Sequence, residues 1–151
     1  MSQLWRIGRT LLGLLLRRPL PGTNIVPVMP DGQIVLVQRR DTQQWALPGG
    51  LIDWGEDVIT AAQRELKEET GLEVVGEPRL VGVYSGFDRD PRMHSICITM
   101  AADVRGKFGV LDTAEILTVR EFAPDEIPLQ ALAHDHQRQL MDFFNRVIAL
   151  A

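Results

Sequence analysis

The stretch that most constrains this sequence is Arg64–Gly71, in which charged residues surround one leucine and a glycine ends the run. If the stretch is helical, residues three and four apart share a face, so Glu65, Glu68 and Glu69 point the same way. Gly71 would supply the left-handed C-terminal cap that glycine adopts at little cost. Like charges at this spacing repel by roughly a few tenths of a kcal/mol per pair. A hard divalent cation with oxygen ligands would relieve that repulsion.

A solvated helix face is the alternative, because such charge runs are common on exposed helices. The wider sequence favours a metal site over a solvated face. From Gly50, five residues lead to Glu56, seven more lead to the run R-E-L-K-E-E-T-G-L, and that run ends at Leu72. This spacing resembles the box of the Nudix hydrolase family, and Trp45–Gly49 resembles the usual approach to that box.

The resemblance implies a fold and a chemistry. The implied fold is α/β, an α/β/α sandwich with a mixed central sheet. The implied activity is hydrolysis of the pyrophosphate linkage in a nucleoside diphosphate derivative, with Mg²⁺ or Mn²⁺ neutralising the phosphates. Glu65, Glu68 and Glu69 are the expected metal ligands and catalytic residues. Gly49 and Gly50 would let the backbone come close to metal or phosphate. Arg64 would orient the glutamates.

A further acidic residue is expected before the strand predicted at Thr118–Phe122. In the family, a residue in this neighbourhood often supplies another metal ligand or the general base. Glu115 is the best match, with Asp112 as the second candidate, and a plain loop carboxylate is the alternative. Glu68 and Glu115 both stay open as the base.

Substrate contacts are expected from basic and aromatic residues. The loop 85–92 resembles the Arg-Asp-Pro-Arg loop of ADP-ribose-type family members, although Gly86-Phe87 stands where such relatives often have proline. Its arginines could meet phosphates, and a solvated loop is the alternative. A strand-end arginine could do the same, and aromatic residues could stack on a base or belong to the core. The candidates are Arg39, Arg89, Arg92, Trp45, Tyr84 and Phe87.

The resemblance implies three possible functions. ADP-ribose or a nucleotide sugar is the first substrate class. The alternative is a nucleoside triphosphate, oxidised or not, cleaved to monophosphate and pyrophosphate. A nucleotide sensor without catalysis is the third reading, and the intact box carboxylates speak against it.

Bulk properties limit the remaining classes. The chain has 151 residues, which suits one domain, and a net charge of −4, which gives no general attraction to nucleic acid. Its single cysteine, Cys97, excludes an intramolecular disulfide and fits a reducing cytoplasm. His134 and His136 stand two apart, so on one helix they would not face one site. A homodimer is an expectation from the family alone.

The first 22 residues differ from the rest. Residues 4–18 predict an amphipathic basic helix that packs on the domain or a second subunit, or lies on an anionic membrane surface. Residues 19–22 suggest a Pro/Gly linker, and residues 23–151 form the hydrolase domain. Within it, Asp31-Gly32 predicts a hairpin turn between two strands. The buried side of the box helix is expected at Ile59, Ala62, Leu66 and Thr70, and a C-terminal helix is expected from Ala131 onward.

Overall fold

The structure is a computed structural model that describes residues 18–151. The amphipathic helix expected over residues 4–18 therefore falls almost entirely outside the described residues, and its membrane contact stays a prediction. Within the described part of the chain, no helix is long and apolar enough to cross a membrane.

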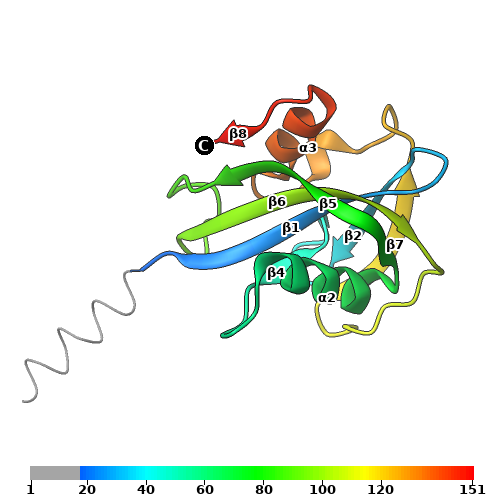
Figure 1. Ribbon diagram of the computed structural model, residues 1–151, viewed down its shortest axis with the longest axis horizontal. Coiled ribbons are helices and arrows are strands. Elements are labelled where there is room, and N and C mark those ends of the chain that lie inside the picture. The colour runs from blue at the N-terminus through cyan, green and yellow to red at the C-terminus, as the bar shows by residue number, and fades with distance from the viewer. Residues whose placement is uncertain (1–17) are drawn as a thin grey trace, which may run out of the picture.

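One mixed sheet forms the centre of the fold and lies between two helices, α2 and α3 (Figure 1). Its strands run in the order β3-β2-β1-β6-β5-β8, with β4 paired to β1 and β7 to β2. The pairs β1–β6 and β5–β8 are parallel and the others are antiparallel. This arrangement confirms the predicted α/β/α sandwich. The elements are β1 (Leu20–Val28), β2 (Ile34–Arg39), β3 (Trp45–Ala46), β4 (Gly49–Leu51), α2 (Val58–Thr70), β5 (Glu73–Tyr84), β6 (Ser95–Arg105), β7 (Ile116–Phe122), η1 (Leu129–Ala131), α3 (His136–Phe144) and β8 (Ala149–Leu150).

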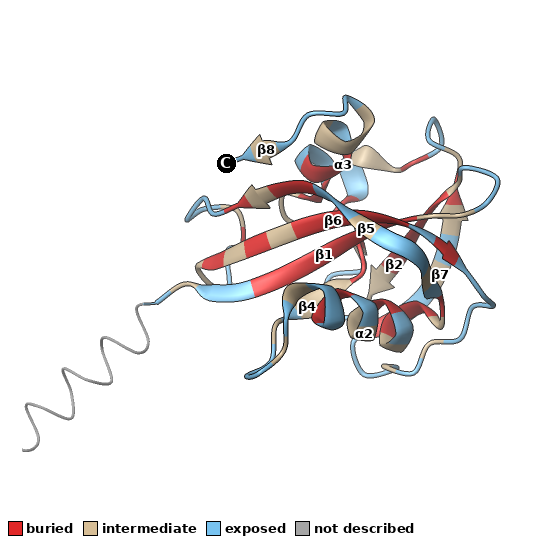
Figure 2. Ribbon diagram, viewed as in Figure 1, coloured by how far each residue is buried: buried red, intermediate tan, exposed pale blue. Residues whose placement is uncertain are grey.

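Neighbouring residues of the central strands enter two different cores. Ile25 of β1 packs in the cluster that contains Leu66 of α2, whereas Val26 packs in the cluster that contains Leu140 of α3. Because side chains alternate between the faces of a strand, a run of apolar residues fills both layers at once. Figure 2 shows the buried residues concentrated along β1 and β6.

The turn between β1 and β2 forms as predicted. Met29 N donates to Gln33 O at 2.8 Å, and Gly32 N donates to Met29 O at 2.8 Å. Gly32 has a φ of +86°, a conformation that glycine adopts without steric cost. The two strands pair antiparallel at Val28 and Ile34.

Helix α2 has a defined cap at each end. Asp57 is the N-cap, and its side chain accepts from Thr60 N at 2.8 Å. Gly71 caps the C-terminus with a φ of +79°, and its N–H donates to Lys67 O at 2.9 Å, as expected. The buried face differs from the predicted one at its first turn. Ile59, which was predicted to be buried, is 44% exposed, whereas Ala61, which was not predicted, is fully buried.

Two expectations about the chain ends were wrong. Leu20–Gly22 are not a linker, because they open β1 and pair with β4 and with β6 from Ser95 onward. The C-terminal helix starts at His136, not Ala131. Residues 132 and 133 instead attach to β3: Leu132 forms a bridge with Trp45, and Ala133 N donates to Trp45 O. The chain then leaves α3 and adds β8 to the edge of β5.

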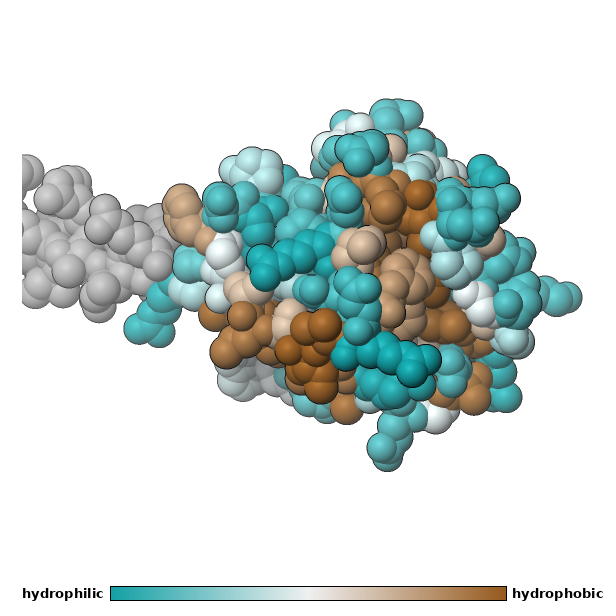
Figure 3. All heavy atoms as spheres, turned by 90° about the horizontal axis from the view of Figure 1, so that it is seen from above, coloured by the Kyte–Doolittle hydropathy of each residue, from teal (hydrophilic) through white to brown (hydrophobic). Residues whose placement is uncertain are grey.

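The surface seen from above in the view of Figure 1 mixes hydrophilic and hydrophobic residues (Figure 3). Exposed apolar side chains beyond α3 contribute to the molecular surface, including Ile148 at 72% and Leu150 at 87% exposed. Scattered exposed apolar residues of this kind are normal for folded proteins.

We predict that Gly71→Ala destabilises the protein by about 2 kcal/mol or more. Left-handed backbone costs an L-residue about 1–2 kcal/mol, and a Cβ here would lie 2.7 Å from Gly109 N and 2.9 Å from Gly109 O. Gly32→Ala is the matched control, because Gly32 has a similar φ but nothing within 4 Å of its would-be Cβ. Urea unfolding of both variants checks this, and equal losses would contradict the steric part of the prediction.

Candidate active site

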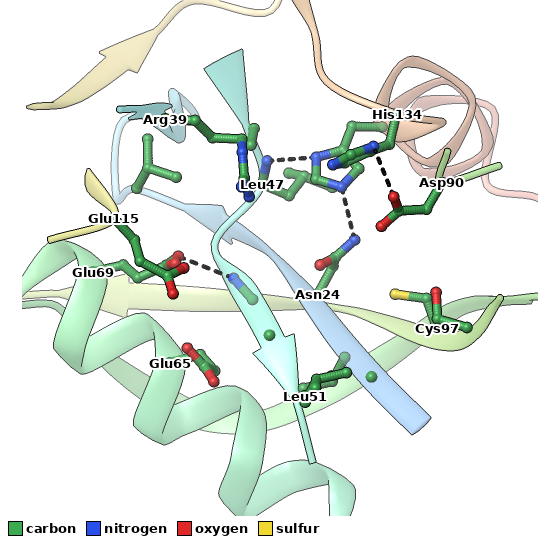
Figure 4. A pocket seen from close by; sticks show the side chains of 18 of the residues that line it. Asn24, Arg39, Leu47, Leu51, Glu65, Glu69, Asp90, Cys97, Glu115 and His134 are labelled. Carbon is green, nitrogen blue, oxygen red and sulfur yellow. Dashed lines mark hydrogen bonds and ion pairs between the residues drawn. The ribbon is translucent and has the colours of Figure 1, made fainter. Parts of the chain in front are cut away.

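A cavity of about 400 Å³ opens beside α2 and β4. Figure 4 shows Glu65, Glu69 and Glu115 on one side of it and Asp90 and His134 on the other. The acidic side is completed by further carboxylates that also line the cavity, Glu68, Asp112 and Asp53, the last of which lies 3.8 Å from Arg64. Six carboxylates at one end of a cavity give it a strongly negative potential.

Arg64 is the cation that holds this acidic end together. It binds Glu56 through two parallel hydrogen bonds of 2.8 and 3.0 Å, a geometry that suits the planar guanidinium. It also donates to Glu65 Oε1 at 2.8 Å and to Glu68 Oε2 at 3.4 Å. A last bond at 3.2 Å reaches Leu51 O, which ties β4 to the helix. The structure thus places Arg64 where it can orient the glutamates, and it holds the pKa of Glu56 at about 2.

Glu69 is the most buried carboxylate of the set, at 5% exposed. Its Oε2 accepts from Gly49 N at 3.1 Å. Burial raises the pKa of Glu69 to about 8, with repulsion from Glu65 and Glu115 adding to the effect. Burial also raises the pKa of Glu65, against the opposing influence of Arg64. Both shifts mean that the protein's own groups do not offset the cost of burying a charged carboxylate here.

Gly49 and Gly50 are required by packing against the protein itself. A Cβ at Gly50 would lie 2.4 Å from Glu65 Oε1, and one at Gly49 would lie 2.2 Å from Thr23 O. Gly50 therefore makes room for the Glu65 carboxylate. The expectation that these glycines admit a metal or a phosphate stays a prediction.

The acidic residues fit a hard divalent cation by their chemistry. All of them offer oxygen ligands, which Mg²⁺ and Ca²⁺ prefer, and raised pKa values at Glu65 and Glu69 are what uncompensated ligands would show. Over residues 18–151, however, no three acidic, histidine or cysteine side chains converge into a finished coordination group. Arg64 engages one oxygen each of Glu65 and Glu68, so ligation would draw on their other oxygens.

Three arginines expected to contact substrate do line the cavity, namely Arg39, Arg89 and Arg92. Each has an acidic partner. Arg39 pairs with Asp41 at 2.7 Å, Arg92 with Asp90 at 2.9 Å, and Arg89 with Asp135 at 2.8 Å.

Arg89 is the least exposed of the three arginines. Its side chain is 10% exposed, and it donates to Ser95 O at 3.3 Å and to Ser95 Oγ at 2.8 Å besides its ion pair. These contacts tie the loop 85–92 to β6 and to the residue before α3. They give Arg89 a structural role in this conformation.

The three aromatic candidates do not line the cavity. Trp45 packs edge-on against Phe122 in the core, with ring centroids 4.9 Å apart. Tyr84 is 1% exposed and its hydroxyl donates to Asp142 Oδ2 at 3.0 Å. Phe87 is 78% exposed and packs on His94. For Trp45 and Tyr84 the structure thus shows the alternative that the sequence left open, a place in the core, and it puts Phe87 outside the cavity wall.

His134 and His136 both line the cavity, although their spacing of two residues predicted that they would not face one site. His134 precedes α3 in a left-handed conformation with a φ of +51°, and His136 opens the helix, so the helical spacing rule did not apply. Their rings lie 5.8 Å apart. Asp135 could have indicated in the sequence that the helix starts at His136, because aspartate favours the position just before a helix.

His136 is a buried neutral imidazole that supports β1 and the approach to β4. Its Nδ1 accepts from Leu47 N at 2.9 Å, and its Nε2 lies 3.1 Å from Asn24 Nδ2. Burial lowers the pKa of His136 to about 3. Asn24 in turn donates to Gln139 Oε1 at 2.9 Å, so the network links β1 to α3. Asn24 was not predicted at the site, and His136 was not assigned this supporting role, because neither residue belongs to a motif. Cys97, by contrast, is buried in β6 as expected.

Comparisons with known proteins agree with this architecture. The model of the NUDIX domain family matches residues 18–144. An ADP-ribose pyrophosphatase of Methanocaldococcus jannaschii is 41% identical over 116 residues, which are 75% of this chain and 66% of that protein. A Bacillus subtilis protein with a provisional 8-oxo-dGTP diphosphatase name is 31% identical over 124 residues, 82% of this chain and 79% of its own. The crystal structure of a MutT NUDIX hydrolase from Burkholderia pseudomallei superposes with a TM-score of 0.73 at 29% identity, covering 83% of this chain and 98% of the other.

The raised pKa of Glu69 predicts how the stability of the cation-free protein depends on pH. The group titrates at about 8 when folded and near its ordinary 4.5 when unfolded. Between these values the folded state binds more protons, so the free energy of unfolding falls as pH rises from about 4.5 to 8. Glu69→Gln removes the titration and keeps an acceptor for Gly49 N, so its stability should fall less over the same interval.

Urea unfolding with a chelator at several pH values checks this prediction. Glu73→Gln is the control, because Glu73 is an exposed carboxylate whose pKa is lowered by Lys67. Its stability should keep the pH dependence of the parent protein. If Glu69→Gln kept it as well, Glu69 would not be the group that titrates.

Proposed function

The chain belongs to the Nudix hydrolase family, and we propose that it hydrolyses the pyrophosphate linkage of ADP-ribose or a similar nucleotide sugar. Water forms a bond to one phosphorus and the bond from that phosphorus to the bridging oxygen breaks, so ADP-ribose would give AMP and ribose 5-phosphate. One observation carries the proposal: the box carboxylates Glu65, Glu68 and Glu69 line a single cavity with Glu115.

Glu65, Glu68 and Glu69 would hold a divalent cation, Mg²⁺ first and Mn²⁺ as the alternative. Such a cation, when bound, neutralises phosphate charge and lowers the pKa of water. Arg64 fixes the side chains of Glu65 and Glu68, so little conformational freedom is lost when they bind. Gly49 N–H fixes Glu69 in the same way.

Proton removal from the attacking water falls to a carboxylate. Glu115 and Glu68 are the candidates, because both line the cavity and both are less buried than Glu69. Glu68 already accepts a hydrogen bond from Arg64 at 3.4 Å, so one of its carboxylate oxygens is engaged within the protein. We therefore favour Glu115 as the base.

The substrate class rests on sequence similarity and on the charge of the cavity. The Methanocaldococcus jannaschii relative is named an ADP-ribose pyrophosphatase, and the matched region spans 66% of its length. Arg39 and Arg92 also line the cavity, and each is paired with an aspartate. A nearly neutral, hydrogen-bonding surface suits the hydroxyl groups of a sugar better than an additional phosphate.

A nucleoside triphosphate is the second candidate substrate, and the Bacillus subtilis relative is the observation that favours it. This reaction would release pyrophosphate and a nucleoside monophosphate. A sensor that binds nucleotide without turnover remains the third reading, and it is the least compatible with a complete carboxylate set. We further propose a cytoplasmic homodimer without nucleic-acid partners, in line with the net charge of −4.

We predict that, with Mg²⁺, ADP-ribose is the preferred substrate in a panel that includes other nucleotide sugars, dinucleoside polyphosphates and nucleoside triphosphates. Chromatography of the products identifies the bond that breaks. AMP with ribose 5-phosphate supports the proposal. Pyrophosphate released from a triphosphate would replace it with the second candidate, and nucleotide binding without any turnover would support the sensor.

Glu69→Gln should lower kcat/KM by at least about 100-fold while the fold persists. Loss of groups that only support metal ligands typically costs about 10–100-fold, so loss of a ligand should cost more. Glu73→Gln, on the exposed side of the chain, is the matched control and should stay fully active. Ordinary activity of Glu69→Gln at the same Mg²⁺ concentration would remove Glu69 from the proposed metal site.

A further inference from the structure

The segment between β6 and β7 brings Asp112 and Glu115 to the cavity without regular secondary structure. One end of it is fixed on the last turn of α2. Glu68 O accepts from Leu111 N at 2.8 Å and from Asp112 N at 3.0 Å. The carbonyl groups that end a helix lack partners within it, and this segment supplies them.

Asp112 and Glu115 use their carboxylates differently. Asp112 Oδ1 accepts from Ala114 N and from Glu115 N, each at 3.2 Å, so it closes a turn within its own segment. Aspartate commonly binds backbone N–H groups in this way. The Glu115 side chain points into the cavity toward Glu69 (Figure 4). Of the two, Glu115 is the one directed at the reacting groups, and its placement depends on the backbone that carries it.

The other end of the segment is held by Arg40, which follows β2. Its backbone N–H donates to Glu115 O at 2.8 Å. Its side chain continues past this bond, and Nε donates to Thr113 O at 3.1 Å while Nη2 reaches Ile116 O at 3.5 Å. These carbonyl groups lie on both sides of Glu115. A charged donor makes such bonds stronger than a neutral one would.

We propose that Arg40 is a positioning residue that sets where the Glu115 carboxylate stands in the cavity. The proposal rests on the proposed function, in which Glu115 acts on the attacking water. Arg40 acts through the backbone of residues 113–116 and contacts no reacting group. Its planar guanidinium can span two carbonyl oxygens, which the single ammonium of lysine does less well.

This role differs from that of the preceding residue. Arg39 lines the cavity and pairs with Asp41, whereas Arg40 turns to the segment before β7. In the β2–β7 pair the register shifts between Gln38 and Arg39, next to the point where Arg40 makes its contacts. A register shift weakens the regular ladder locally, so the arginine side chain supplies contacts where the strand pairing ends.

Hydrogen exchange measured by NMR tests whether Arg40 holds the segment, with no need for turnover. Arg40→Ala should speed exchange of the Leu111, Asp112 and Ile116 amides by about tenfold and leave the amides of β6 unchanged. Arg40→Lys should lie between it and the parent protein. Arg79→Ala removes an exposed arginine on β5 and is the matched control, with exchange unchanged throughout. Unchanged exchange at the three amides in Arg40→Ala would overturn the proposal.

A double-mutant cycle tests whether Arg40 acts through Glu115. Arg40→Ala should lower kcat by about tenfold, the size typical of lost supporting contacts, with KM nearly constant and the melting temperature little changed. Combined with Glu115→Gln, it should cost no more than Glu115→Gln alone. Effects that multiply in the double variant, or full activity of Arg40→Ala, would overturn the proposal.

The outcomes separate this inference from the proposed function. If the parent protein turned over no substrate of the panel, the proposed function would fail, and exchange at the three amides would still decide the placement of the segment. If the parent were active and Glu115→Gln kept full activity, the role of Glu115 would be wrong, and with it the inference that Arg40 acts through it.

Discussion

The structure around the cavity depends on a conflict between like charges. Six carboxylates line one end of it, and Arg64 is engaged with Glu65 and Glu68 while also binding Glu56. Glu69 lies beyond that arginine's contacts and is buried, so the protein alone favours its protonated form. Folding therefore gathers carboxylates whose negative charge the protein's own cations neutralise only in part. A site of this kind gains stability when a cation arrives, because the bound state removes a repulsion that the unfolded chain does not have.

The sheet supplies the rigidity that holds these mutually repelling carboxylates in place. Neighbouring residues of β1 enter the two cores on opposite faces, so the strand beside β4 is fixed from both sides. Gly50 lacks a Cβ where one would lie 2.4 Å from the Glu65 carboxylate, and Gly71 turns the chain where one would lie 2.7 Å from Gly109. The first glycine determines how closely β4 can approach the helix. The second determines how closely the segment with Glu115 can approach the end of that helix.

Much of this could be predicted from sequence because it is local. The cap at Gly71, the turn at Gly32 and the shared face of the box glutamates follow from spacing within one element. The failures involve contacts between distant parts of the chain. Leu20–Gly22 contain proline and glycine and yet form a strand, because β4 and β6 provide partners on both sides. For the aromatic residues the sequence left both substrate stacking and the core open, and only the long-range packing shows Trp45 in the core and Phe87 at the surface. His134 and His136 were judged by a helical rule that does not apply before the helix begins.

The two sides of the cavity treat charge in opposite ways, and this difference bears on specificity. Among the glutamates negative charge exceeds positive charge, whereas Arg39, Arg89 and Arg92, which also line the cavity, each have an aspartate partner. A phosphate that displaced one of those aspartates would gain an arginine and leave a carboxylate behind, half-buried in the case of Asp135 and buried in the case of Asp90. Such an exchange gives little net attraction, because an unpaired buried charge is costly. Hydroxyl groups can instead bind to the outside of an intact ion pair. Under the proposed function, affinity for phosphate would therefore be concentrated at the glutamate side, where a bound cation would supply it, and the paired side would select the group attached to the phosphate.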